Sequence, residues 1–175
     1  MNNIIENILS RSSVREFTTE RVAPEMIEIM LRAAMSSPSA CNCQPWEFVV
    51  IDDREILNTI PKYVKGAHMA ARAQHAIAIC GVMERTLDAP LDAFWIQDCA
   101  SATENMLLAA HAMDLGAVWC GVYPDNGTSR VEAISKLLNL PEGVIPMSIV
   151  VFGHKKAQAA IHDKWRPEYI HYNKF

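Results

Sequence analysis

The sequence predicts a single three-layer α+β domain. Four short segments rich in β-branched, aromatic or other apolar residues alternate with longer segments of helical spacing, the pattern of a sheet covered by helices. Half of the 175 residues are apolar, which is enough to bury a core in one compact domain. No repeat, low-complexity tract or Gly/Ser linker divides residues 1–175, so we expect one domain.

The first part of the chain predicts two helices joined by a polar segment. One helix covers Asn3 to Leu9 and gives way to RSSVREF, Arg11 to Phe17. The next helix starts at Pro24, because a missing N–H is harmless in the first turn. Its apolar residues recur at helical spacing, at positions 26, 27, 30, 31 and 34, and it should end before Pro38.

Two buried strands follow, with short helices between them. The segments WEFVVI, Trp46 to Ile51, and HAIAICGV, His75 to Val82, are apolar and rich in residues that favour strands. Residues 53–73 predict one or two short helices, interrupted by Pro61 and Gly66.

A long apolar helix is predicted from Leu91 to Leu115. Ala, Leu and Met dominate it, and Gly116 supplies the stop signal. Because the helix is apolar on several faces, we expect it to be buried in the core or in a subunit interface. The segment AVWCGVY, Ala117 to Tyr123, then predicts the third strand.

The last part of the chain predicts a helix, a strand and an extended tail. Thr128 or Ser129 caps a helix through Leu138, and MSIVVFG, Met147 to Gly153, forms the fourth strand. Residues 154–175 contain a tryptophan, two tyrosines and a phenylalanine without clean periodicity. We expect so much aromatic surface to pack along the body or across a partner subunit.

Composition disfavours several classes of partner. A net charge of -4 gives no global basic field to attract nucleic acid or an anionic membrane. The first residues lack the pattern of a signal peptide, and no window reaches the roughly 20 apolar residues of a membrane span, so we expect a cytoplasmic protein. The five cysteines form an odd set, which favours free thiols in a reducing compartment.

Familiar catalytic and metal motifs are missing from the sequence. Cys41 and Cys43 are separated by one residue and lack a second pair of ligands, so no metal site is predicted. There is no GxGxxG, GxxxxGK[ST], GxSxG or HExxH motif either.

Two clusters of basic residues suit a phosphate. Arg11 and Arg15 flank the hydroxyls of Ser12 and Ser13, and guanidinium groups give strong charge-assisted bonds to phosphate oxygens. The alternative is a solvated loop that caps a helix. In the tail, Lys164 and Arg166 would project to the same side and complete the site, unless the tail is simply solvated.

A third cluster, SPSACNCQPWEF, combines two amide side chains with two prolines. Pro38 and Pro45 stiffen a loop that holds Asn42 and Gln44 just before a buried strand. Amides can both donate to and accept from the edge of a planar heterocycle such as a flavin. The alternative is that they pair only with the loop backbone.

Four segments, in this order, resemble the short form of the nitroreductase family. They are RSSVREF, PSACNCQPWEF, FWIQDCASATENMLLAAHAMDLGAVWCGVYP and KWRPEYIHYNKF, so the resemblance covers nearly the whole chain. It implies a central, mostly antiparallel sheet flanked by helices and an intertwined homodimer with two FMN molecules at the interface. Residues 154–175 would then pack on the partner subunit.

The resemblance also implies roles for individual residues. Arg11 and Ser13 match the phosphate-side residues, as do Lys164 and Arg166 in the tail, and Arg15 matches the cation near flavin N1 and O2. A loop that reaches the flavin of the other subunit is matched by Pro38, Ser39, Ala40 and Asn42. The strand end that faces the ring near N5 is matched by the backbone of Cys120, Gly121 and Val122. Lys62, Lys65 and His68 cannot be aligned with family positions.

The predicted activity is reduction of a nitroaromatic, quinone or related small acceptor by NADH or NADPH through FMN, with ping-pong kinetics. No side chain stands out as a catalytic acid, so protons would come from solvent. Two alternatives stay open. One is other reductive chemistry on the same fold, dehalogenation or enoate reduction, and the other is a flavin-binding module without turnover.

Overall fold

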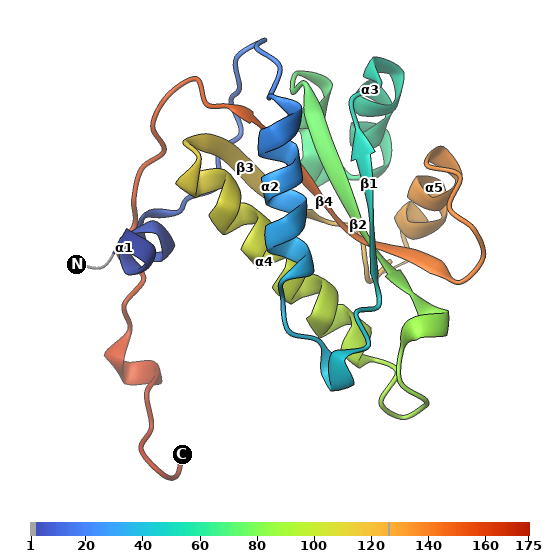
Figure 1. Cartoon of the computed structure of the whole chain (residues 1–175), viewed down its shortest axis with the longest axis vertical. Coiled ribbons are helices and arrows are strands. Elements are labelled where there is room, and N and C mark those ends of the chain that lie inside the picture. The colour runs from blue at the N-terminus through green and yellow to red at the C-terminus, as the bar shows by residue number, and fades with distance from the viewer. Residues whose placement is uncertain (1–2, 126) are drawn as a thin grey trace.

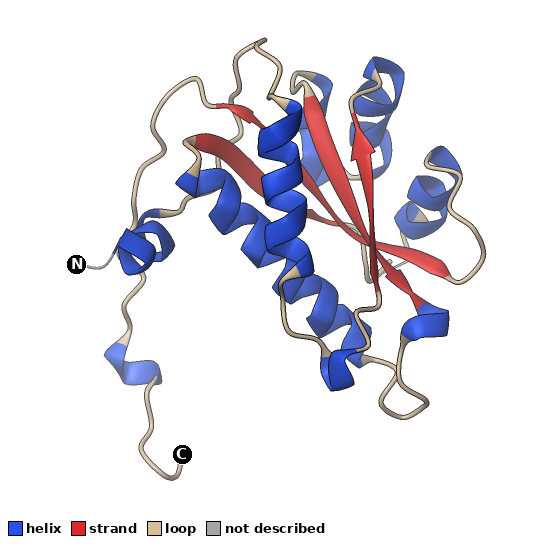
Figure 2. Cartoon of the chain, viewed as in Figure 1, coloured by secondary structure: helices blue, strands red, loops and turns tan. Residues whose placement is uncertain are grey.

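The computed structural model describes residues 3–125 and 127–175, and it has three layers with a four-stranded sheet in the middle (Figures 1 and 2). The strands are β1 (Trp46–Ile51), β2 (His75–Val82), β3 (Leu115–Gly121) and β4 (Val144–His154). Their order is β1-β2-β4-β3, and each neighbouring pair is antiparallel. The predicted α+β class and antiparallel sheet are therefore confirmed.

Helices cover both faces of the sheet because successive strand residues point to opposite sides. The helices α2 (Pro24–Met35) and α4 (Phe94–Ala112) pack on one face, onto residues such as Ile77 and Phe152. The opposite face of the sheet carries Ala78 and Val151 and packs against three further helices. These helices are α3 (Arg54–Tyr63), the 3₁₀ helix η2 (Lys65–Ala71) and α5 (Arg130–Leu137).

The long apolar segment is a helix, as predicted, but it is shorter than predicted, and its buried residues recur at helical spacing from Trp95 to Ala110, on one side of the helix. The helix α4 ends at Ala112, and Asp114 makes the left-handed turn with φ 61°. Gly116 is no helix stop, because it lies inside β3, where a Cβ would come within 2.6 Å of Val14. Among the described residues, neither α4 nor any other helix is long and apolar enough to cross a membrane.

Two further local predictions were wrong. Pro61 does not interrupt the helix, because it lies in the last turn of α3 and leaves the bond from Val64 N to Ile60 O intact. The hydroxyls of Thr128 and Ser129 do not cap α5. Asp125 does so instead, since its Oδ1 accepts from the backbone N–H groups of Thr128 and Arg130.

The chain ends stand apart from the three layers (Figure 1). The helix α1 (Asn3–Ser10) contacts α4, and Asn7 donates to the carbonyl of Leu108. Beyond residue 160 every tail residue is exposed, including the short helix η4 (Pro167–Tyr169). The tail beyond residue 160 is therefore largely uncovered by its own chain. Two other 3₁₀ helices are η1 (Ala40–Asn42) and η3 (Met83–Arg85).

Candidate functional site

The segment RSSVREF runs beside the sheet edge formed by β3. Val14 N donates to the carbonyl of Ala117 at 3.0 Å, and Thr18 N donates to that of His154 at 2.8 Å. Phe17 forms an isolated antiparallel bridge with Lys155, which starts the tail. These backbone bonds fix the two arginines of the segment relative to β3, at the side of the molecule where the tail leaves the sheet.

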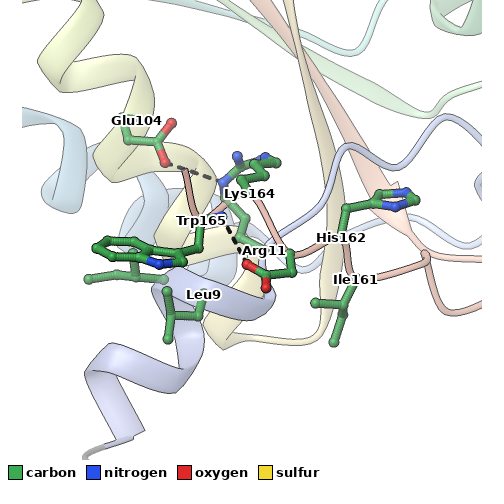
Figure 3. Close-up of a pocket in the computed structure, with 9 residues that line it drawn as sticks. Leu9, Arg11, Glu104, Ile161, His162, Lys164 and Trp165 are labelled. Carbon is green, nitrogen blue, oxygen red and sulfur yellow. Dashed lines mark hydrogen bonds and ion pairs between the residues drawn. The ribbon is translucent and has the colours of Figure 1, made fainter. Parts of the chain in front are cut away.

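Arg11 and Lys164 line the same pocket, so the structure brings together cations from the two ends of the chain (Figure 3). The pocket has a volume of about 520 Å³, and its walls include the apolar side chains of Leu9 and Trp165. The Arg11 side chain is mostly buried, and its Nε lies 3.2 Å from Oε1 of Glu104 on α4. The pair holds the guanidinium at the pocket in a fixed position.

The other predicted phosphate-side residues lie outside this pocket. The Ser12 hydroxyl donates to the carbonyl of Ala160 at 2.7 Å, so it fastens the start of the tail. Ser13 is exposed beside it. Arg166 is exposed and donates to the carbonyl of Trp165, and it does not line the Arg11 pocket.

The end of β3 presents an open backbone edge. Gly121 is exposed, and a Cβ built there would meet no heavy atom within 4 Å. Its neighbours Cys120 and Val122 are buried, and Val122 N donates to the carbonyl of Met147 at 3.0 Å. Burial raises the pKa of the Cys120 thiol to about 11, against the opposing effect of the Arg15 guanidinium. The thiol therefore stays neutral at neutral pH.

The segment that could not be aligned lies next to this strand end. Cys120 Sγ donates to the carbonyl of Gly66 at 3.4 Å, which places η2 beside β3. Lys65 and His68 are exposed on η2 and become candidates for the site. Neither periodicity nor a motif marks them in the sequence. The signal is tertiary, because only the sheet order brings residues 65–71 against β3.

The loop of residues 37–44, which we call the amide loop, is held by α4. The backbone N–H of Ala40 donates to Oδ1 of Asp98 at 2.9 Å, and the backbone N–H of Gln44 donates to the Ser39 hydroxyl at 2.9 Å. Asn42 and Gln44 have left-handed φ values of 58° and 48° and are exposed. Pro38 is exposed as well.

The predicted residues thus lie in three places on one chain: the Arg11 pocket, the end of β3 and the amide loop. The amide loop meets α4 at Asp98, near its start, whereas Arg11 meets α4 at Glu104. Six residues of helix correspond to about 9 Å along the axis. The pocket lined by Arg11 and Lys164 contains no residue of the amide loop, so this chain does not bring the loop and these cations into one pocket.

Comparison with known proteins gives consistent matches. The sequence model of the Nitroreductase family matches residues 8–154. A Methanothermobacter thermautotrophicus protein, whose name proposes NADH dehydrogenase or NAD(P)H nitroreductase activity, is 39% identical over 99% of this chain and 88% of its own. A crystal structure from Bacteroides thetaiotaomicron with the same proposed activities superimposes with a TM-score of 0.93 at 38% identity, covering 100% and 99% of the two chains.

A third match contains the cofactor. The crystal structure of a Desulfovibrio desulfuricans protein, whose name proposes a nitroreductase, was solved in complex with FMN. It has a TM-score of 0.84 and is 27% identical, and the match covers 100% of this chain and 99% of the other.

Proposed function

This chain belongs to the Nitroreductase family, and from that premise we propose that it binds FMN and uses NADH or NADPH to reduce small acceptors such as nitroaromatics or quinones. The observation that carries the proposal is the pocket where Arg11 and Lys164 meet. The similarity to a protein solved with FMN supports the same ligand.

The residues present fit such a ligand. A pocket of about 520 Å³ lies within the usual size range of small-molecule sites. Arg11 and Lys164 supply positive charge for a phosphate, which would take the place of Glu104 beside the Arg11 guanidinium, a group that suits phosphate geometry well. The space in front of Gly121 leaves room for a flat ring beside the strand backbone.

Bound FMN supplies the hydride chemistry, and the protein supplies orientation and charge. We propose that Arg11, Ser13, Lys164 and Arg166 hold the phosphate, and that Arg15 places a fixed cation where the ring becomes negative on reduction. In this arrangement the backbone at residues 120–122 would face the ring edge. Cys120 does not act as a nucleophile at neutral pH, since burial raises the pKa of its thiol to about 11.

We further propose that the active form is a homodimer. The amide loop and the Arg11 pocket lie apart on one chain, which supports a dimer in which Asn42 and its neighbours contact the cofactor held by the other chain. The exposed apolar side chains of α1 and the aromatic tail provide surface for that contact. The five free cysteines suit the reducing cytoplasm in which we place the protein.

The test begins with the absorbance spectrum of the purified protein, which should show bound flavin or take up added FMN. Anaerobic NADH or NADPH should then bleach the flavin, and nitroaromatics or quinones should restore the colour. A protein that remains colourless with excess FMN contradicts the proposal. Bound flavin that neither nicotinamide bleaches indicates a binding module, and reoxidation only by halogenated phenols or activated alkenes indicates another reductive chemistry.

A further inference from the structure

Two polar side chains on α4 point toward the start of the amide loop. Asp98 and Asn105 are seven residues apart, which is about two helical turns and places them on one face of the helix. Both make hydrogen bonds to residues at or just before the loop. The helix that fills the core therefore also determines where the loop lies.

The Asp98 contact is a buried carboxylate bond. The residue is only 6% exposed, and its Oδ1 accepts from the backbone N–H of Ala40 at 2.9 Å. A buried charge is costly without hydrogen bonds, so the carboxylate strongly favours a loop conformation that offers this N–H group.

Ala40 is a central point of the amide loop. Its carbonyl accepts from Cys43 N at 3.0 Å, and the adjacent Ser39 carbonyl accepts from Asn42 N at 3.0 Å. The next residue, Cys41, has a left-handed φ of 49°. Because these bonds connect one end of the loop with the other, fixing Ala40 also fixes the backbone that carries Asn42 and Gln44.

Asn105 holds the preceding residues. Its Nδ2 donates to the hydroxyl of Ser37 at 2.8 Å and to the carbonyl of Ala33, in the last turn of α2, at 3.2 Å. Ser37 is 6% exposed, so this contact is sheltered from water. The loop is thus held at its first residue and again at Ala40.

We propose that Asp98 and Asn105 are positioning residues that preset the amide loop for contact with the cofactor of the partner subunit. We call this pair the α4 clamp. The inference rests on the proposed function for the role of the loop, but the clamp itself is a property of the free chain. Asp98 acts through the backbone N–H of Ala40, and Asn105 acts through the hydroxyl of Ser37.

The first test measures the clamp without cofactor. Amide hydrogen exchange of residues 38–44 should be faster in Asp98→Leu, which loses the acceptor at similar volume, and near wild type in Asp98→Asn, which keeps an Oδ1 acceptor. Gln97→Leu, at an exposed neighbouring position, is the matched control and should leave loop exchange unchanged. If Asp98→Leu does not fold, Ser37→Ala takes its place, because it removes only the Asn105 contact with the loop.

The second test measures the effect on the site. FMN should bind about tenfold more weakly to Asp98→Leu or Ser37→Ala, with near wild-type affinity restored in Asp98→Asn. The KM for the acceptor should rise more than kcat falls, because substrate positioning is impaired and the electron transfer chemistry is retained.

The outcomes separate the two proposals. Unchanged loop exchange in both Asp98→Leu and Ser37→Ala overturns the clamp, whether or not FMN binds. Faster loop exchange with unchanged FMN affinity and unchanged KM overturns the positioning role. A wild-type protein that takes up no FMN contradicts the proposed function. The exchange data then still decide whether the clamp exists.

Discussion

At the scale of single residues, the buried imidazole of His75 links folding to pH. Its Nε2 accepts from the backbone N–H of Val22 at 3.2 Å, so the neutral ring carries its proton on Nδ1, which has no hydrogen-bond partner among the described residues. Burial lowers the pKa of His75 below 6.5, and the positive charge of Arg21 lowers it further, while Asp52 opposes them. Protonation would remove the acceptor and add a buried charge.

His75 should therefore destabilise the fold in mild acid. Because its folded pKa lies below the unfolded value of about 6.5, its stabilising effect is complete above pH 6.5 and is lost as the pH falls toward the folded pKa. Urea unfolding between pH 8 and pH 5 should show a smaller loss of stability in His75→Gln than in wild type. His162→Gln, in the exposed tail, is the control. Equal pH dependence in all three proteins would rule out this role.

Gly81 illustrates a position where only glycine fits. A Cβ on this β2 residue would lie 2.3 Å from the ring of Trp95, which is buried and packs edge-on against Tyr123. Gly81→Ala should destabilise the protein by about 1–3 kcal/mol, because a packed ring must move. Gly66→Ala is the control, since a Cβ there meets nothing within 4 Å. Equal urea midpoints for the two variants would contradict the explanation.

Arg15 offers a residue-scale test of the proposed electrostatics. Removing its charge should make the bound flavin harder to reduce, because the negative charge formed on reduction loses its cation. The reduction potential of Arg15→Ala should be lower than that of wild type, with a smaller effect on FMN affinity. Arg72→Ala, an exposed arginine on the same chain, should leave the potential unchanged. An unaltered potential in Arg15→Ala would refute the role.

At the scale of elements, the sequence predicts best where local pattern and burial agree. The bounds of β1 and β2 were predicted to the residue, since both are apolar runs that end at turn or helix signals. The predicted helix stop at Gly116 was wrong. A glycine after a helical run usually indicates a helix end, but this glycine is needed for close contact with Val14. That contact joins residues about 100 positions apart, and no local pattern contains it.

The cap of α5 was mispredicted for a related reason. The hydroxyls of Thr128 and Ser129 stand at the expected positions, yet Asp125 accepts from two N–H groups at once. Asp125→Ala should cost about 1 kcal/mol in free energy of unfolding, and Asp125→Asn should retain most of it. Ser129→Ala is the comparison, because its hydroxyl makes no capping bond. Urea unfolding that ranks Ser129→Ala below Asp125→Ala in stability would contradict this assignment.

The candidate site was predictable to different degrees. Arg11 and Lys164 could be paired from the sequence because both suit a phosphate, and the structure brings them to one pocket. The hydrogen bond of Ser12 to the tail carbonyl could not be foreseen, since it depends on where the tail leaves the sheet. The role of Asp98 could not be predicted either, because a carboxylate within an apolar helix belongs to no motif and its partner is a backbone N–H.

At the scale of the whole molecule, one chain leaves a large apolar surface uncovered. In α1, Ile8 is 47% exposed and Leu9 is 61% exposed, and in the tail Trp165 is 65% exposed. Tyr169 and Tyr172 are exposed to a similar or greater degree. Water contact on this scale is unfavourable for a folded protein, and a second chain that covers the tail and α1 would remove it.

The tail aromatics should therefore control dimerisation separately from phosphate binding. The double variant Tyr169→Ser, Tyr172→Ser keeps Lys164, Trp165 and Arg166 but loses two large exposed side chains, so the dimer dissociation constant should rise by roughly 30-fold or more. Sedimentation velocity over a range of concentrations measures this change. Tyr63→Ser, on α3 and 44% exposed, is the matched control and should leave the dimer intact. FMN should be lost from the double variant as the protein is diluted and should be regained at high concentration, because in the proposed dimer the amide loop of the other chain completes each site. A wild-type protein that stays monomeric with FMN bound would contradict both the dimer and the shared site.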